Sequence, residues 1–247
     1  MVDNKQLETY LEALDFEAMP AEKILRWVSE TFAERAVLLT SFQHTGVAMI
    51  HMAAELDLDL RIATIDTLRL PEETYRFIAE VEERYQRPIE ICQPDPKQVE
   101  KMVGQHGEFL FFDSKFKQEH CCSVRKVRPR DKLLQTVDCW ISGLRRDHSS
   151  FRQQTPKAAM HLEYGTQRKI LKLNPLADWT EEQLLDFNRR NNVPQHALYS
   201  QGYTSIGCVI CSTPNLPGED KRAGRWRWFN GSDGGSGDKE CGLHYNI

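Results

Sequence analysis

Short apolar runs alternate with amphipathic stretches through the first half of this chain. The strand-like runs are 36–40, 60–65, 88–92 and 138–142. Helical spacing of apolar positions marks 47–56 and 71–85. Strands joined through helices run parallel, because such a crossover returns the chain to the same end of the sheet. The alternation therefore predicts an α/β protein with a doubly wound, mostly parallel sheet and helices on both faces.

Further helices are expected on either side of this pattern. Residues 7–14 and 22–32 have helical spacing and would form an N-terminal helical cap within 1–34. Another helix is expected at 180–190, where Thr180 is suited to be the N-cap and acidic residues follow in the first turn.

The composition is that of an ordinary globular protein with an appendage. The chain has 247 residues, of which 40% are hydrophobic, enough for a substantial core. Residues 231–237 contain only glycine, serine and aspartate, which is typical of a flexible linker. We therefore expect one domain at 1–230, followed by a flexible tail at 231–247.

The charge and the termini limit the partners and the compartment. A net charge of −4 gives no general electrostatic drive toward nucleic acid or anionic lipid. The start of the chain lacks a basic region followed by an apolar run, and no stretch reaches the roughly 20 apolar residues that span a bilayer. We therefore expect a cytoplasmic protein without a membrane or nucleic-acid partner. In that reducing compartment, the seven cysteines favour metal binding or catalysis over disulfides.

Polar residues follow the expected strands at 41–46, 66–70 and 143–148. In doubly wound sheets the ligand lies beyond the carboxyl ends of the strands, so these loops are expected to converge on it. Ser41 and Thr45 offer hydroxyls before a helix N-terminus, as in a phosphate cradle, although the loop is not a Walker loop. An ordinary strand-to-helix turn or a solvated charged loop would also explain these residues.

Four cysteines occur as two pairs, Cys121 with Cys122 and Cys208 with Cys211. Their number and softness fit a closed thiolate metal site. Adjacent cysteines rarely bind one small ion, but they can bind different irons of an iron-sulfur cluster, which we favour. Structural zinc, a redox-active dithiol and inert thiols remain the alternatives. Two further cysteines at 92 and 139 lie in expected strands and are interpreted as small buried apolar residues.

Cys241 stands apart from these pairs, near the end of the chain and after a basic segment. Positive neighbours lower the pKa of a thiol and populate the reactive thiolate, so Cys241 is a candidate nucleophile. His244 follows three residues later and is a candidate catalytic partner. The alternative is a terminal tail with an incidental cysteine and a solvated histidine. In the basic aromatic run 225–229, we favour a lid in which Arg225 meets an anion over a platform for stacking nucleic-acid bases.

Five motifs together carry a resemblance to a known family. They are 121–126 (CCSVRK), 140–147 (WISGLRRD), 207–211 (GCVIC), 222–226 (RAGRW) and 240–244 (ECGLH). In this order they resemble assimilatory adenosine 5'-phosphosulfate (APS) reductases, the iron-sulfur branch of the APS/PAPS reductase family. PAPS is the 3'-phosphorylated form of the same nucleotide. The likeness spans 36–244.

The resemblance implies an adenine nucleotide alpha-hydrolase-like sheet and a four-iron four-sulfur cluster on Cys121, Cys122, Cys208 and Cys211. It also implies Cys241 as the nucleophile in thioredoxin-dependent reduction of APS to sulfite and AMP, through an S-sulfocysteine. That reaction belongs to assimilatory sulfate reduction toward cysteine biosynthesis. A thioredoxin or a glutaredoxin-like donor would be the protein partner, and self-association is expected by likeness alone.

Candidate substrate contacts come from the loops and from the basic motifs. They are Ser41, Thr45, Asp66, Lys126, Arg145, Arg146, Arg152, Arg222 and Arg225. The cationic members are suited to neutralise phosphate and sulfate, with arginine able to bind either in a bidentate manner.

The chain departs from the family pattern at two loops, and other functions compete. Gln43 and His44 stand where relatives have glycine or small residues, and Leu68 follows Asp66-Thr67 where glycine is common. PAPS reduction or dual specificity is the nearest alternative. A tRNA-thiolation enzyme on a related sheet would need a Ser-Gly-Gly-x-Asp loop, which is absent. A non-enzymatic, zinc-stabilised binding module is the remaining alternative.

Overall fold

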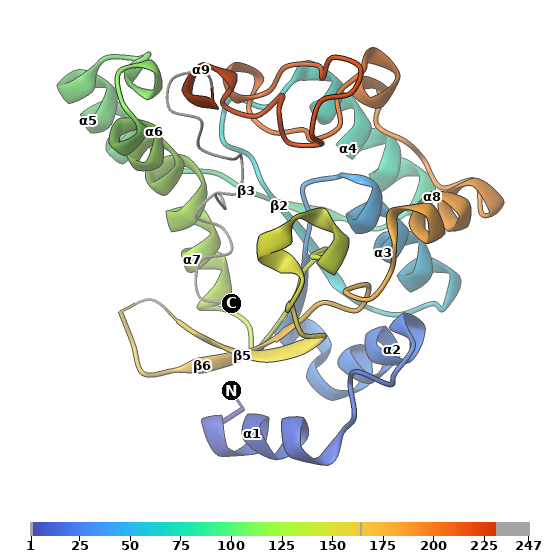
Figure 1. The fold of residues 1–247 in the computed structure, drawn as a ribbon. Helices are drawn as coiled ribbons and strands as arrows, with labels where there is room; N and C mark the ends of the chain where they lie inside the picture. The colour runs from blue at the N-terminus through green and yellow to red at the C-terminus, as the bar shows by residue number, and fades with distance from the viewer. Residues whose placement is uncertain (1, 164, 231–247) are drawn as a thin grey trace.

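A computed structural model describes residues 2–163 and 165–230, and Figure 1 shows the chain as a ribbon. A six-stranded sheet forms its centre. The strands are β1 (Ala36–Leu39), β2 (Arg61–Ile65), β3 (Ile89–Cys92), β4 (Cys139–Ile141), β5 (Ala158–Leu162) and β6 (Lys169–Leu173). The α-helices are α1 (Asn4–Ala13), α2 (Ala21–Phe32), α3 (His44–Glu55), α4 (Glu72–Tyr85), α5 (Pro96–His106), α6 (Lys115–Cys122), α7 (Arg128–Leu134), α8 (Glu181–Arg190) and α9 (Arg227–Asn230). A π-helix (Ser123–Val127) joins α6 to α7.

The strand order is β3-β2-β1-β4-β6-β5, and every neighbouring pair is parallel except β5 with β6. From β1 the chain first builds outward through β2 and β3, and then returns to place β4 on the other side of β1. The carboxyl ends of β1 and β4 therefore meet where the winding direction changes. This is the position at which open α/β sheets bind their ligands.

Alternate residues of the strands face two different cores. Leu38 and Ile141 belong to a large cluster with apolar residues of α1, α2, α3, α4 and α8. Val37 and Trp140, one residue away on the same strands, pack with Leu133 and Leu134 of α7. Figure 1 shows the same division, with α5, α6 and α7 on one side of the sheet and α2, α3, α4 and α8 on the other. The sheet is thus doubly wound, as the sequence predicts.

The other elements expected from the sequence are confirmed within two or three residues at most ends. Thr180 caps α8 and forms a reciprocal capping box with Gln183. The sequence pattern did not predict α5, the long helical segment from α6 to α7, or the β5–β6 hairpin. No helix of the described residues is long and apolar enough to cross a membrane.

A buried carboxylate joins the amino ends of three strands, β1, β4 and β6. Asp138 accepts hydrogen bonds from Arg35 at 2.5 and 2.9 Å, from Arg168 at 2.7 Å and from the Val2 backbone N–H at 3.1 Å. Burial opposes ionisation, but the two arginines outweigh it and lower the pKa of Asp138 to about 2. This site therefore ties the start of the chain to the sheet.

We predict that Asp138→Asn lowers the free energy of unfolding by about 2 kcal/mol at neutral pH, because two arginines lose their anionic partner. Since the pKa is lowered in the folded state, the contribution is complete above the ordinary pKa of 3.8 and is lost as the pH falls toward about 2. Urea unfolding at several pH values measures both effects. Asp57→Asn, at an exposed ion pair with Arg87, is the control and should cost less than about 1 kcal/mol. Equal urea midpoints for the two variants would contradict this role.

Candidate functional site

A cavity of about 230 Å³ opens at the carboxyl ends of β1, β2 and β4. All three loops expected from the sequence contribute to its lining, through Ser41, Thr67 and Gly143 among others. A fourth wall comes from the segment 204–208 and from 221–225, which lie far away in sequence. The convergence of the loops on one cavity is thus confirmed.

The loop after β1 turns sharply into α3. Phe42 adopts a left-handed conformation with φ 55°, and its backbone N–H donates to Thr40 Oγ1 at 3.0 Å. Gly46 passes so close to Thr40 that a Cβ at this position would overlap the hydroxyl. The N-terminus of α3 and the hydroxyls of Ser41 and Thr45 consequently face the cavity, an arrangement that suits an anion.

The bulky residues of this loop reach across to another segment. Gln43 accepts a hydrogen bond from the Ile206 backbone at 3.2 Å and donates to Ser41 Oγ at 3.0 Å. His44 stacks on Tyr199, with ring centroids 3.8 Å apart. Burial, together with the positive charge of Arg145, lowers the pKa of His44 to about 4, so its ring is neutral. Gln43 and His44 therefore fix the loop against the segment 197–206.

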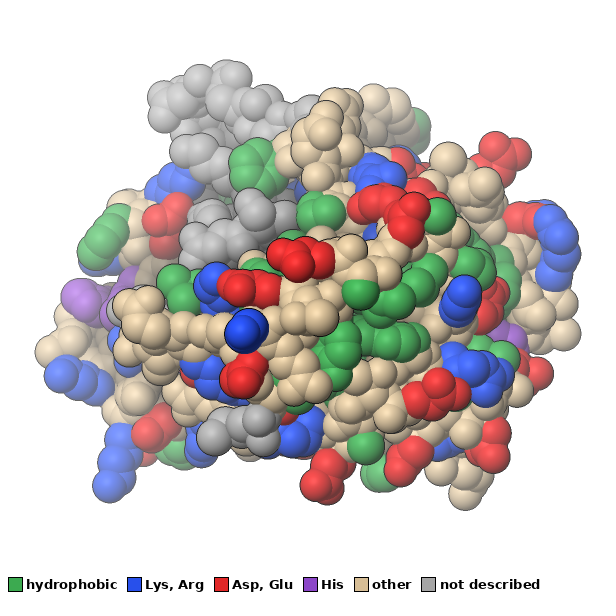
Figure 2. All heavy atoms as spheres, turned by 90° about the horizontal axis from the view of Figure 1, so that it is seen from below, with side chains coloured by type: hydrophobic (Ala, Val, Ile, Leu, Met, Phe, Trp, Pro, Cys, Tyr) green, Lys and Arg blue, Asp and Glu red, His purple; other side chains and the backbone are tan. Residues whose placement is uncertain are grey.

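The cavity wall is strongly cationic although the chain is acidic overall. Its positive side chains are Lys126, Arg145, Arg152, Lys221, Arg222 and Arg225, and Glu181 is the carboxylate that lines it with them. By contrast, the lower end of the molecule, seen in Figure 2, shows acidic and basic side chains interspersed. Concentrated cations around a cavity favour an anionic ligand.

Arg145 is held in place from two sides. Its Nη1 donates to Thr45 Oγ1 at 3.0 Å, and its Nε and Nη2 donate to Asp147 at 2.9 and 3.1 Å. Asp147 also accepts from the Glu181 backbone N–H at the start of α8, at 2.5 Å. Arg145 itself is only 3% exposed. The guanidinium is therefore fixed at the cavity wall before any ligand binds.

His148 completes this corner and was not singled out from the sequence. It lies at the end of a 3₁₀-helix (Arg146–His148) and lines the cavity. Burial and the surrounding charges of Arg145, Arg152, Arg222 and Lys221 lower its pKa to about 2. A histidine is a weak signal in sequence, because its protonation state depends on neighbours brought together by the fold.

Two predicted substrate contacts do not line the cavity. Arg146 donates to the Thr155 carbonyl at 2.9 Å and pairs with Glu17 at 2.6 Å, so it ties this loop to the N-terminal cap. Asp66 is 4% exposed and accepts hydrogen bonds from Leu68, Tyr75 and Gln93 at 2.7 to 2.9 Å. Both residues hold their loops together in this structure.

The two cysteine pairs lie on segments that the fold brings together. Cys121 and Cys122 end α6, and Cys211 ends a 3₁₀-helix (Val209–Cys211) that follows Cys208. Cys121 packs in one apolar cluster with Phe111, against which Ile210 also lies. Cys121 and Cys211 are buried, and Cys122 and Cys208 are partly buried.

Arg125 and Thr67 bridge the two pairs. The Arg125 guanidinium acts on the Cys121 thiol, whose pKa it lowers against the larger effect of burial, and donates to the Thr67 carbonyl at 3.1 Å. The Thr67 hydroxyl lies 3.1 Å from Cys208 Sγ. Cys121 and Arg125 are four residues apart, a spacing that places two side chains side by side on a helix. This spacing was the sequence signal available for the contact between them.

The π-helix after Cys122 governs where the next residues point. Pro129 lacks the N–H that would bond to the Arg125 carbonyl, which accounts for a break in the regular helical ladder here. Arg125 is buried in this segment, whereas Lys126 lines the cavity. The segment thus joins the cysteine region to the cationic wall.

The thiols influence one another electrostatically. Burial, with smaller contributions from the nearby thiols of Cys208 and Cys121, raises the pKa of Cys211 to about 12, while Arg225 opposes this shift. Burial likewise raises the pKa of Cys121. Within 2–163 and 165–230, no three His, Cys, Asp or Glu side chains are arranged to hold a single metal ion. The donor set of gathered cysteine thiols fits a centre of soft, thiolate-bound metal.

The loop after β2 contains a strained residue. Leu68 has φ 59°, in the left-handed region that glycine adopts without penalty. Its backbone N–H donates to Asp66 Oδ1 at 2.8 Å, which helps to hold this conformation. Leu68 therefore adopts a conformation that glycine favours, and the contact with Asp66 supports it.

The remaining predictions fall on two kinds of residues. Cys139 is fully buried in the large core, which confirms its interpretation as a buried apolar residue, whereas Cys92 is only partly buried and packs against the α7 side. Cys241, His244 and the predicted tail at 231–247 lie outside the described residues.

Comparisons with known proteins give a consistent result. A family model described as phosphoadenosine phosphosulfate reductase domain matches residues 35–214. A protein named adenosine 5'-phosphosulfate reductase from Allochromatium vinosum is 35% identical over 244 residues, 99% of this chain and 91% of the relative. One of the same name from Sinorhizobium fredii is 40% identical over 210 residues, 85% of this chain and 80% of the relative.

A solved structure shares the fold. The crystal structure of phosphoadenylyl-sulfate (PAPS) reductase from Candida auris, in a phosphate complex, superposes with a TM-score of 0.69. The two chains are 23% identical, and the match covers 86% of this chain and 98% of the other. The predicted fold class is thereby confirmed.

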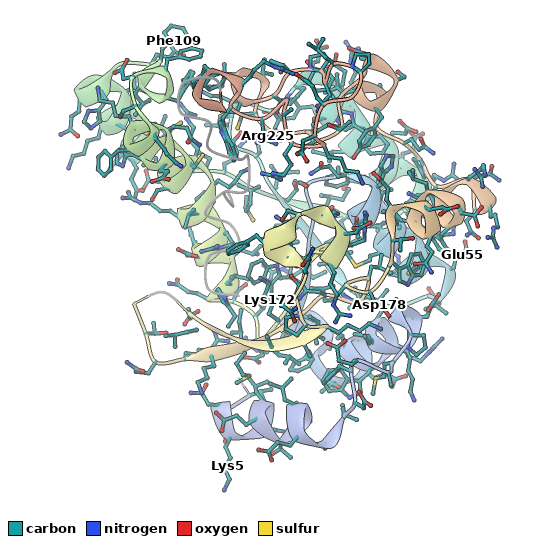
Figure 3. All side chains as sticks on the ribbon, viewed as in Figure 1. Lys5, Glu55, Phe109, Lys172, Asp178 and Arg225 are labelled. Carbon is teal, nitrogen blue, oxygen red and sulfur yellow. The ribbon has the colours of Figure 1, made fainter. Side chains whose placement is uncertain are left out.

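Gly207 offers a test of the cationic wall, because a Cβ there would overlap the Arg225 guanidinium. Figure 3 shows Arg225 in the upper part of the molecule, above Lys172 and Asp178. We predict that Gly207→Ala lowers stability by less than about 1 kcal/mol, since the end of a flexible side chain can move, but weakens binding of inorganic sulfate at least about threefold. Thermal melting with increasing sulfate measures both. Gly104→Ala, whose added methyl group meets nothing within 4 Å, is the control. Unchanged sulfate protection in Gly207→Ala would contradict this role of Arg225.

Proposed function

This chain belongs to the phosphoadenosine phosphosulfate reductase family, and we propose that it reduces APS to sulfite and AMP in sulfate assimilation. The relatives that share most of its length carry the name of that activity. The observation that carries the proposal is a cationic cavity at the switch point of the sheet, directly beside two cysteine pairs. The cations of the cavity suit an anionic nucleotide, and the neighbouring cysteine pairs suit sulfur chemistry.

The proposed reaction uses Cys241 as the nucleophile. Its thiolate attacks the sulfur of APS, the bond from that sulfur to the phosphate oxygen breaks, and AMP leaves with the electron pair. Cys241 then carries an S-sulfocysteine. A thiolate of reduced thioredoxin, or of a glutaredoxin-like protein, attacks the Cys241 sulfur and sulfite leaves with the electrons of the S–S bond. The second thiol of the donor resolves the mixed disulfide, so the dithiol supplies the two electrons.

The residues of the cavity have distinct proposed roles. Ser41, Thr45 and the N-terminus of α3 bind phosphate oxygens, and Arg145 is fixed beside them by Asp147. Lys126, Arg152, Arg222 and Arg225 neutralise the sulfate and phosphate charges. His244 is proposed to assist Cys241. These cations lower the free energy of AMP as a leaving group, because negative charge grows on its phosphate as the bond breaks.

We propose a four-iron four-sulfur cluster held by Cys121, Cys122, Cys208 and Cys211 as the metal centre. When bound, it would cross-link the two cysteine segments and supply charge beside the cavity rather than carry electrons. Arg125 and Thr67 already connect these segments in the protein itself. Lys126 follows Arg125 directly, so the position of the cluster ligands fixes the position of a cavity cation.

PAPS is the second candidate substrate. Lys221 lines the cavity and forms a salt bridge with Glu181. A ligand with an additional phosphate could compete with Glu181 for this ammonium group, which would admit the 3'-phosphorylated nucleotide. The two cysteine pairs favour APS by family likeness.

The central test is sulfite release with reduced thioredoxin, measured with APS and with PAPS. We predict turnover of APS, and complete loss of turnover in Cys241→Ser, because serine does not form the thiolate nucleophile. Mass spectrometry of the unreduced protein after mixing with APS should show a sulfite-sized adduct on Cys241. Cys92→Ser is the matched control and should retain activity. Activity without Cys241, or an adduct elsewhere, would refute the mechanism.

The metal centre has its own test. We predict about four iron atoms per chain and a brown colour in anaerobically purified protein, with both lost in Cys208→Ser together with most activity. The colour should persist in Cys241→Ser. Iron content and visible absorption measure these effects beside turnover. Zinc in place of iron, or full activity in an iron-free Cys208→Ser protein, would refute the proposed cluster.

A further inference from the structure

His148 occupies an unusual position, because it accepts rather than donates hydrogen bonds within a group of cations. The Arg145 backbone N–H lies 3.3 Å from its Nδ1, and Arg152 Nη1 lies 3.0 Å from the same atom. The backbone N–H of Arg145 and the guanidinium of Arg152 can only donate hydrogen bonds. Nδ1 must therefore be the acceptor in both contacts.

This assignment fixes the tautomer of the ring. A neutral imidazole that accepts at Nδ1 carries its proton at Nε2. A second proton at Nδ1 would break both contacts and add a buried charge among Arg145, Arg152, Lys221 and Arg222. Burial and these four cations together lower the pKa of His148 to about 2. Within residues 2–163 and 165–230, the Arg145 and Arg152 contacts of the His148 ring are both made at Nδ1. The Nε2–H group is thus the remaining donor of a ring that lines the cavity.

We propose that His148 is a substrate-binding residue that donates Nε2–H to an anionic oxygen of the sulfonucleotide. This assignment rests on the proposed function and adds a contact that neither the cysteine chemistry nor the arginines supply. The donor is neutral, so it forms a hydrogen bond to the anion without adding repulsion to the four cations around it. Because Arg145 and Arg152 point their donors at Nδ1, they also fix the direction of Nε2–H before the ligand arrives.

A purely structural role is the competing explanation, in which His148 only anchors Arg145 and Arg152. Two substitutions separate the roles. The side-chain oxygen of asparagine can replace Nδ1 as an acceptor but leaves no donor at the position of Nε2. The longer glutamine side chain can place its amide N–H near the position of Nε2 but not an acceptor at that of Nδ1. His148→Asn therefore removes the proposed donor, and His148→Gln removes the anchor.

The affinity for APS, measured by calorimetry in a Cys241→Ser background of the full chain with its metal centre, decides between them. We expect His148→Asn to weaken binding about tenfold or more and His148→Gln to stay within about threefold of the parent. Thermal melting verifies that each variant is folded, and His106→Asn at an exposed histidine is the control. Parent-like affinity in His148→Asn, or an equal loss in both variants, overturns the assignment alone. A parent that does not bind APS contradicts the proposed function itself, and the assignment falls with it.

Discussion

The parallel pairing of β1 with β4 is the constraint on which the candidate site depends. It aligns Val37 with Trp140 and Leu38 with Ile141, although about a hundred residues separate the two strands. The loops that leave these strands are consequently neighbours, and the hydrogen bond from Arg145 to Thr45 spans the boundary between them. The pairing is itself maintained by burial on both faces, since alternate residues face the two cores.

The cations that line the cavity attract an anion only if nearby carboxylates hold them in place without cancelling all of their charge. The Asp147 carboxylate accepts hydrogen bonds from the Arg145 guanidinium and from the backbone N–H at the start of α8. The negative charge of Asp147 is therefore shared between a side chain and a helix end. Glu181 pairs with Lys221 at the edge of the cavity. Burial, together with the positive potential that remains, lowers the pKa values of His44 and His148 and keeps both rings neutral. The same arrangement that attracts an anion therefore also determines which hydrogen-bond donors are uncharged.

Much of the fold was predictable because its strands are short apolar runs separated by helices with clear caps. The missed elements lack those signals. The helical segment 115–134 contains a dense run of basic residues and Pro129, a pattern typical of a loop. Its helical state depends on the tertiary contacts of Cys121, Val124 and Leu133. In the β5–β6 hairpin, His161 and Lys172 are buried beside Trp140, so polar residues occupy positions where a strand pattern requires apolar ones.

The residue types of the candidate site were predictable from the sequence, but the directions in which their side chains point were not. Arg145 and Arg146 are equivalent in sequence, yet one faces the cavity and the other pairs with Glu17, because the chain enters a 3₁₀-helix between them. The contact of Arg125 with Cys121 was not predicted, because the helical segment that gives their four-residue spacing a meaning was not expected. Thr67 meets Arg125 and Cys208 only in the folded chain. The sequence identifies the residue types in a loop, whereas the local backbone conformation determines which of their side chains face the cavity.

Backbone strain at the cavity follows from the same geometry. Phe42 and Leu68 both adopt left-handed conformations, and each lies three residues beyond the end of its strand, β1 or β2. Such conformations cost free energy for residues other than glycine and persist only where surrounding contacts enforce them. Here Thr40 and Asp66 accept the backbone N–H groups, and Arg125 holds the carbonyl of Thr67. Because Arg125 also acts on the Cys121 thiol, a single guanidinium group joins the cavity-lining loop after β2 to the cysteine region.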